Sequence, residues 1–424
     1  MIKKIILITI IIIVSYKVNA LSVFSFYGPA EMLYQRDAYG EGMGGTGTGD
    51  MYRVNTNLIN PALSATINRV YFSTAMTISN NYYTDVNEKE NADSKFSLPY
   101  FTLVFPYKQN RFGFHYTNLC STELKASRVT TFDETIGDVN SKEDVAFSLY
   151  RAGLFWTNRN VNLNFGVGVN YLFGSSSRSS SQSFLPGKDL TDSKITQDNR
   201  FQSPFFNIGV AKNMGNFSFG LAASYPMELN GDKTITSNAG KQEGGDSNFD
   251  YPATANMGVT FKLTDHFFLS TDLDYEMWGA TDNFDHSIDV TRIGAGLSWA
   301  GIPLSKKFLA IFPCRVGVSY RNLPFKVNDS VVHEMAYHFG VSLPLRQYDS
   351  YMEVASKFYN RGNFITETGF SENGFLITVG LHGFDFFRRP PNRKMPRDIP
   401  KSFEERSAET GGRGSEGGGR RHEE

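Results

Sequence analysis

Apolar and polar residues alternate along most of this chain, which is the pattern of β-strands. In the run from Val161 to Phe173 the odd positions are apolar or aromatic, and most even positions carry Asn or Gly. The run from Tyr251 to Leu263 alternates in the same way. An amphipathic helix would instead repeat its apolar residues about every three to four positions. These segments are therefore predicted to be strands.

The last alternating run, Gly374 to Phe387, is the most informative one. It is long and apolar on one face, and it ends in an aromatic cluster of Phe384, Phe386 and Phe387. This pattern suits a strand with one face in lipid and the other in a polar lumen. A soluble edge strand of this length and hydrophobicity would promote aggregation. The run predicts a strand in an outer-membrane barrel.

Similar runs recur from about Val70 onwards, and together they predict an all-β fold, a transmembrane antiparallel β-barrel of about fourteen strands. The expected strands are 70–78, 96–106, 111–119, 145–157, 161–173, 200–212, 216–225, 251–263, 267–278, 287–299, 308–321, 331–345, 349–359 and 374–387. The barrel is assigned to residues 69–387.

The connections between these runs alternate in length. The short ones are 107–110, 158–160, 214–215, 264–266 and 346–348, and the long polar ones are expected at 79–95, 120–144, 174–199, 226–250 and 279–286. Outer-membrane barrels have short periplasmic turns and long external loops. A soluble sandwich or propeller is the alternative, but such folds do not usually separate loop lengths so regularly. An even number of strands places both termini in the periplasm.

Both ends of the chain differ from the barrel. Residues 1–20 have a basic start, an apolar block and a small residue, Ala20, before the expected cut, as in a secretory signal peptide. A single membrane-spanning helix needs about 20 apolar residues, and Lys17 interrupts the block too early. Residues 388–424 are charged and Gly-rich, which predicts a disordered periplasmic tail. Its basic residues are candidates for contact with anionic headgroups or a periplasmic partner.

Composition narrows the function further. Aromatic residues make up 14% of the chain and glycines number 39, as expected for aromatic girdles and a crowded lumen. The formal net charge of −1 gives no case for nucleic-acid binding. Two cysteines, Cys120 and Cys314, are compatible with one disulfide or with two free thiols.

A dense glycine region precedes the first strand. A phosphate-binding loop would need a Gly-Lys-Ser/Thr sequence between a strand and a helix, and neither is present. Because only Gly permits very close backbone approach, we expect residues 21–68 to pack inside the barrel as a hatch. Its motif residues are Gly42, Gly44, Gly45, Gly47, Gly49, Asn60, Pro61 and Ala62.

The segment GMGGTGTGD (42–50), the following Asn-Pro-Ala (60–62) and about fourteen strands resemble the FadL-type long-chain fatty acid transporter family. Segments 315–324 and 353–362 resemble related FadL-like proteins, including PorV-like subunits of secretion systems. The resemblance implies a fourteen-stranded barrel with a lumenal hatch. It also implies that hydrophobic ligands leave sideways beside a kinked strand. Pro99, Pro106 and Pro204 are candidate strand irregularities, whereas the tail departs from the family pattern.

Charged residues fall on the expected lumen face of neighbouring strands. The candidates are Arg292, Arg315, Arg321, Glu334 and Glu353, with Asp272, Asp274, Glu276, His338 and Lys357 beside them. A salt-bridge ladder is the first interpretation, and an arginine that binds the carboxylate of a ligand is the second. No catalytic constellation, metal-ligand spacing or cofactor motif is found, so no enzyme activity, metal or cofactor is expected.

Two function classes follow. The first is passive uptake of hydrophobic small molecules, such as long-chain fatty acids, across the outer membrane. The second is a structural or secretion-associated barrel that binds protein partners. Expected partners are outer-membrane lipid, a hydrophobic ligand, and the barrel-assembly machinery through Phe387; a periplasmic or secretion partner is a further candidate.

Overall fold

The computed structural model describes residues 22, 24, 32, 36–54, 56–84, 90–131, 138–184, 191–227, 230–238, 240–246, 249–281, 286–302, 308–345, 350–362 and 371–383. All of them belong to the first of two compact units, which runs from Met1 to Asp385. The predicted signal peptide, the aromatic cluster at 384–387 and the predicted tail lie outside the described residues. Among the described residues, no helix is long and apolar enough to cross a membrane.

One antiparallel sheet contains all the described strands. They are β1 (Tyr71–Thr84), β2 (Glu90–Ser97), β3 (Tyr100–Tyr107), β4 (Asn110–Thr131), β5 (Asp138–Asn158), β6 (Asn164–Phe184), β7 (Ser193–Asn213), β8 (Phe217–Pro226), β9 (Asn230–Ser237), β10 (Gly240–Asp246), β11 (Thr254–Lys262), β12 (Phe267–Glu276), β13 (Val290–Trp299), β14 (Cys314–Val327), β15 (Ser330–Pro344), β16 (Tyr351–Arg361) and β17 (Ser371–His382).

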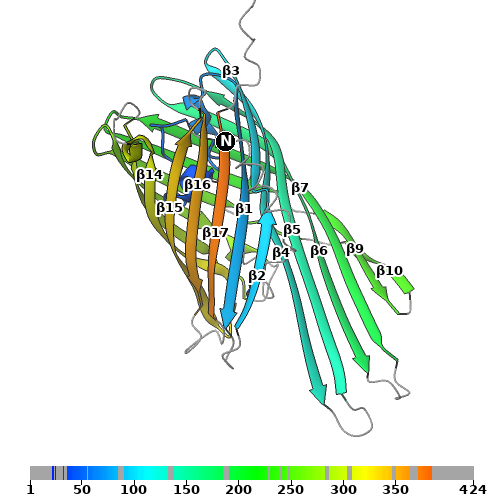
Figure 1. The fold of residues 1–424 in the computed structure, drawn as a ribbon. Coiled ribbons are helices and arrows are strands. Elements are labelled where there is room, and N and C mark those ends of the chain that lie inside the picture. Colours follow the sequence, from blue (N-terminus) through cyan, green and yellow to red (C-terminus); the bar gives the residue numbers. More distant parts are fainter. Residues whose placement is uncertain are drawn as a thin grey trace, which may run out of the picture. The chain divides into compact units, whose positions relative to one another are not determined.

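Three of the wall strands are interrupted. β2 and β3 both pair with β1, β8 and β9 both pair with β7, and β10 and β11 pair with β9 and β8 respectively. The wall therefore has fourteen strand positions, which confirms the predicted fold class. β1 pairs with β17 from Ser73–His382 to Thr84–Ser371 and closes the barrel (Figure 1).

The two faces of the wall follow the alternation of the sequence. In β17, Thr378 and His382 are buried, whereas Ile377, which directly precedes Thr378, is 37% exposed. Large apolar side chains are exposed in the same way along the other strands, for example Phe165, Val169 and Leu221. This outward apolar surface faces lipid, and the protein is an outer-membrane β-barrel.

The predicted long loops are wrong for much of their length. Residues that were assigned to the loops 79–95, 120–144, 174–199 and 226–250 largely extend β1, β2, β4–β7, β9 and β10. β4 has 22 residues, about 70 Å of extended chain, whereas a span needs about 9–11. Figure 1 shows the hairpins of β4–β7, β9 and β10 projecting beyond the ends of β1 and β17. Past the lipid neither face needs apolar residues, so the alternation stops although the main-chain pairing continues.

Four strands also start at least three residues later than expected, at 164 instead of 161, 254 instead of 251, 290 instead of 287 and 314 instead of 308. The strand expected at 308–321 begins at Cys314, because Phe308–Ile311 forms a 3-10 helix, η4. The strand expected from Tyr251 begins at Thr254. Cys314 is an exposed free thiol and Cys120 is buried in β4, so the structure has no disulfide between them.

The hydrogen-bonded ladder of the wall is interrupted between β2 and β4, and this interruption is here called the wall gap. The β3–β4 ladder ends at Tyr100–Thr117, next to Pro99, and in the described chain no ladder joins β2 to β4 beyond it. Proline cannot donate to a ladder, which accounts for the interruption there. β4 bulges between Asn118 and Cys120, and Met32 pairs with Cys120 in an isolated antiparallel bridge. Met32 therefore occupies an edge of β4 that a wall strand would otherwise cover.

Residues 36–54 and 56–66, here called the inner segment, lie against the inward face of the wall. The segment contains a short helix, α2 (Ala38–Glu41), and a 3-10 helix, η2 (Pro61–Thr66). α2 contacts β15, β16 and β17, and η2 contacts β4–β7 on the other side of the barrel. The inner segment thus bridges the lumen.

Candidate functional site

The glycine loop of the inner segment follows α2. Asp37 caps this helix, its carboxylate accepting a hydrogen bond from the Gly40 amide at 2.8 Å. The loop after it contains Gly44 at φ +74°, a left-handed conformation that favours glycine. A Cβ at Gly44 would lie 2.6 Å from the carbonyl oxygens of Ala295 and Val318. Glycine is thus required here both by the turn and by contact with the wall.

The Asn-Pro-Ala sequence attaches the second part of the inner segment. Asn60 is fully buried and caps η2, its Oδ1 accepting from the Ala62 amide at 3.1 Å. Its Nδ2 donates to the Thr48 carbonyl at 3.0 Å and to the Val210 carbonyl of β7 at 3.1 Å. One side chain therefore joins η2, the glycine loop and the wall.

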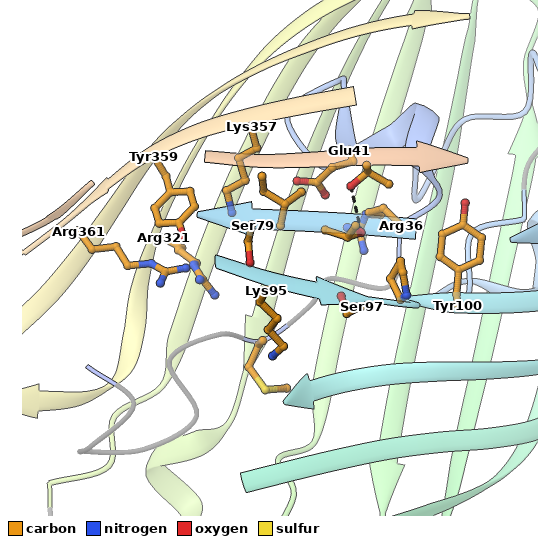
Figure 2. A pocket seen from close by; sticks show the side chains of 15 residues that line it. Arg36, Glu41, Ser79, Lys95, Ser97, Tyr100, Arg321, Lys357, Tyr359 and Arg361 are labelled. Atoms are coloured by element: carbon orange, nitrogen blue, oxygen red, sulfur yellow. Dashed lines mark hydrogen bonds between the residues drawn. The ribbon is translucent and has the colours of Figure 1, made fainter. Parts of the chain in front are cut away.

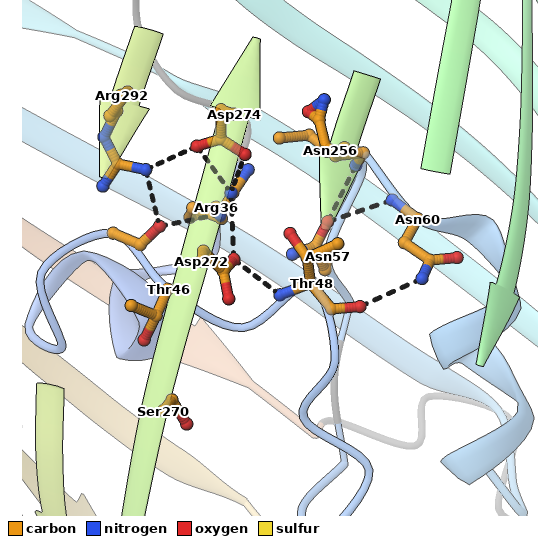
Figure 3. Close-up of polar contacts among 12 residues, drawn as sticks. Arg36, Thr46, Thr48, Asn57, Asn60, Asn256, Ser270, Asp272, Asp274 and Arg292 are labelled. Atoms are coloured by element: carbon orange, nitrogen blue, oxygen red, sulfur yellow. Dashed lines mark hydrogen bonds and ion pairs between the residues drawn. The ribbon is translucent and has the colours of Figure 1, made fainter. Parts of the chain in front are cut away.

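Arg36 is the centre of a buried charge network (Figure 3). Its Nη2 donates to Asp274 at 2.8 Å and to Asp272 at 3.1 Å, both on β12. Arg292 of β13 donates to the same Asp274 carboxylate at 2.6 Å and to the Gly45 carbonyl at 3.1 Å. Asp272 also accepts from the Thr48 amide at 2.9 Å. These charges are buried, and they bind the glycine loop to β12 and β13.

A second ion-pair network crosses β14–β17. Glu334 accepts from Arg321 at 2.8 Å and from Lys357 at 2.9 Å, and it also pairs with Arg361. Arg361 pairs in turn with Glu372 of β17 at 2.8 Å. Buried charges are tolerated only when they are paired in this way, so the network spans four neighbouring strands without an isolated charge.

A third set of charges joins the inner segment to β14 and β16. Arg315 pairs with Glu353, and its guanidinium lies 4.2 Å from the ring centroid of Tyr39. Within the inner segment Arg53 pairs with Asp37 at 2.6 Å. Burial alone would raise the pKa of Asp37, but the positive charge and hydrogen bonds of Arg53 hold this pKa at about 2.

The five candidate lumen residues are therefore all buried and all in ion pairs. Sequence reasoning missed Arg36 and Glu372. Arg361 stood within the segment 353–362 that resembles FadL-like proteins, but its charge was not used. Nothing in the local sequence of Arg36 marks it as a lumen residue, because its partners are more than 200 positions away in the chain.

Two small internal spaces lie in the described lumen. A cavity of about 70 Å³ lies between β1, β2 and β16, with Tyr100 and Arg36 at one end and Tyr359 and Arg361 at the other (Figure 2). A second cavity, of about 40 Å³, lies beside Arg151 and Phe205. Sites for small molecules usually have about 300–1,000 Å³. Neither cavity holds a hydrocarbon ligand without movement of its walls.

The inward surface also carries an apolar cluster toward the end of the barrel opposite the short turns. Its buried members are Leu119, Cys120, Leu149, Leu172, Phe201, Phe205, Phe249, Tyr251, Trp278 and Val290, and Met32 and Phe147 pack against them. Leu119 and Cys120 lie at the bulge of β4, and Met32 lies in the wall gap. The apolar cluster therefore begins inside the barrel and ends at the gap.

A family match covers most of the sequence, residues 1–386. The chain belongs to the BamG family. No curated protein matches the sequence significantly.

Among solved structures, the chain is similar to the toluene transporter TodX of P. putida, with 16% identity and a TM-score of 0.58 over 83% of this chain and 99% of that one. It is also similar to the toluene transporter TbuX of Ralstonia pickettii, with 13% identity and a TM-score of 0.53 over 82% and 98%. A Pseudomonas aeruginosa FadL homologue gives 11% identity and a TM-score of 0.55 over 83% and 98%. These similarities confirm a FadL-like fold.

Proposed function

We propose that the protein admits hydrophobic small molecules along the apolar cluster and releases them sideways between β2 and β4. The observation that carries this proposal is the position of the apolar cluster, which ends at the wall gap, whereas the buried ion pairs lie on β12–β17. The similar solved structures support it, because two of them are toluene transporters. Long-chain fatty acids are a narrower candidate within the same class.

The proposed route needs movement of the chain around Met32. The described cavities are small, so a ligand has to displace Met32 from the edge of β4 before it reaches lipid. The isolated bridge between Met32 and Cys120 is a small obstacle compared with the long ladders of the wall. We further propose that residues 21–68 act as the hatch, and that the glycine loop and Asn60–Ala62 keep it in place while Met32 moves.

The test uses Leu119→Asn, which places an amide at the point where the apolar cluster meets the gap. Leu323→Asn is the matched control, because Leu323 is equally buried but lies in a separate cluster on β14. We expect Leu119→Asn to slow the uptake of radiolabelled toluene and oleate by about tenfold, since a buried unpaired amide costs about 1–3 kcal/mol along the route. Unchanged uptake of both probes by a folded Leu119→Asn barrel would refute the proposal.

A structural or secretion-associated barrel that binds a protein partner is the second candidate. The small cavities and the buried ion pairs favour it, because they describe a lumen that is filled rather than open. Here the predicted result is a stoichiometric partner that co-purifies from native membranes, with no uptake of either probe. Uptake that depends on Leu119, with no partner retained, would favour the first candidate.

A further inference from the structure

The end of the barrel with the short turns carries an open depression of about 830 Å³. The inner segment forms part of its lining through Met51–Val54, Ala65 and Thr66, and the turns at 108–109, 159–164 and 212–213 form the rest. The short turns lie at this end, as do the start of β1 and the end of β17, which pair through Ser73 and His382. These features mark it as the periplasmic end. The depression, here called the periplasmic bowl, belongs to neither the apolar cluster nor the wall gap.

All the charged residues that line the periplasmic bowl are positive. Its lining includes Lys108, Arg159, Lys212 and Arg53, and it includes no Asp or Glu. Arg53 is neutralised by Asp37 and Asp50. The other three have no ion pair within the part of the chain that the structure describes: the Arg159 guanidinium donates to the Asn68 amide oxygen, and the Lys108 ammonium lies over the Tyr107 ring. Three uncompensated positive charges therefore surround the bowl.

An apolar contact point accompanies these charges. Val161 is 99% exposed at the tip of its turn, and Leu163 beside it is 42% exposed. Both line the bowl, next to Arg159. Isolated apolar residues on a surface are ordinary, but an aliphatic tip within a ring of like charges suits a ligand with both acidic and apolar groups.

Two other occupants fit the charge less well. The chain's own residues 388–424 contain ten Lys and Arg against seven Asp and Glu, so they carry the same sign as the bowl. Lipid headgroups surround the outer wall, whereas the bowl is lined by the inner segment that bridges the lumen. A soluble periplasmic protein can carry the opposite charge, and it can reach the bowl from the periplasm.

We propose that the periplasmic bowl docks an acidic segment of a periplasmic protein, with Lys108, Arg159 and Lys212 pairing its carboxylates and Val161 contacting an apolar side chain. A volume of about 830 Å³ accommodates a few residues of such a segment. Charge pairs at an exposed rim mainly set the association rate and partner choice, so the interaction depends strongly on salt. This docking is independent of the uptake route, since no residue of the wall gap lines the bowl.

The experiment uses the full chain in nanodiscs of zwitterionic phosphatidylcholine. The probe is a fluorescein-labelled peptide of alternating Glu and Leu, and a second peptide has Gln in place of Glu. Fluorescence anisotropy should show binding of the acidic peptide that weakens with added NaCl. In the triple variant Lys108→Glu, Arg159→Glu, Lys212→Glu, binding should weaken by at least about tenfold, because each rim pair turns from attraction to repulsion. Val161→Ser should weaken it by about threefold.

The matched control is Lys142→Glu, Lys194→Glu, Arg200→Glu, which reverses two lysines and one arginine that are exposed on the extensions of β5 and β7. This control should keep the affinity within about twofold. Heat-modifiable migration verifies folding, and the single variants Arg159→Glu and Val161→Ser replace the triple one if it does not fold. Equal binding of the Gln peptide, an equal loss in the control, or tighter binding of a peptide of residues 388–424 would overturn the proposal.

Discussion

Strands β12–β17 and strands β4–β8 contact the same inner segment with different chemistry. On β12–β17 the contacts are ionic, with Arg36 and Arg292 sharing Asp274 and with Arg315 under Tyr39. On β4–β8, here called the neutral side because its described contacts with the inner segment contain no ion pair, Asn60 donates to the Val210 carbonyl and Ser218 donates to the Gly49 carbonyl at 2.7 Å. Arg151 of β5 also donates to the Leu58 carbonyl at 3.1 Å. The apolar cluster and the wall gap border the neutral side.

This difference indicates which side of the wall fixes the inner segment in place and on which side the inner segment can move. Breaking a buried ion pair by removing one partner costs about 3–5 kcal/mol, because it leaves the other charge unpaired. A neutral hydrogen bond contributes about 0.5–1.5 kcal/mol. The ionic side therefore anchors the inner segment, and movement that opens the gap is expected on the neutral side.

The largest effect is expected for Asp274→Ala. It removes the carboxylate that Arg36 and Arg292 share, and Arg36 then keeps the ion pair with Asp272 and a hydrogen bond to the Gly45 carbonyl. We expect the free energy of unfolding in lipid vesicles to fall by about 3–5 kcal/mol, measured by urea titration with tryptophan fluorescence. The control is Glu143→Ala in the exposed Glu143–Arg178 pair, which should cost at most about 1 kcal/mol. Similar losses in the two variants would contradict an ionic anchor.

An intermediate effect is expected from acid. The pKa of Asp37 is about 2 in the folded protein, below its usual value near 3.9, so its pairing with Arg53 stabilises the fold above about pH 4. This contribution, of the order of 2 kcal/mol, is lost as the pH falls through about 2. The urea midpoint of the wild type should therefore fall more steeply between pH 5 and pH 2 than that of Asp37→Asn. Parallel pH profiles would argue against the pair.

The smallest effect is expected for Asn60→Ala on the neutral side. It removes the η2 cap and two hydrogen bonds, to Thr48 and Val210. We expect a loss of about 1–2 kcal/mol in the same urea titration, and Asn162→Ala at an exposed turn should cost little. Asn60→Ala should also raise toluene uptake if the neutral side yields. A cost as large as that of Asp274→Ala would remove the distinction between the two sides.

The sequence predicted the number and order of the wall strands better than it predicted their lengths or the contacts inside the lumen. All fourteen strand positions correspond to a predicted run, because lipid imposes alternation on every span. The polar run Ser175–Ser183 predicts a loop but extends β6, since a strand in water has no such constraint. The complementary charges Arg321 and Glu334 were visible on adjacent runs. The partners of Arg36 were not, because only closure of the barrel brings that residue to β12.

The closing ladder between β1 and β17 has a consequence for the order of assembly. It joins Ser73 to His382, whereas the β4–β5 hairpin joins Thr131 to Asp138 across a short connection. Contacts between residues distant in sequence form slowly, because the entropy of a large loop has to be lost before the contacts stabilise it. We therefore expect the tall β4–β7 hairpins to form early and the β1–β17 seam to form last, so that the barrel spends part of its biogenesis as an open sheet.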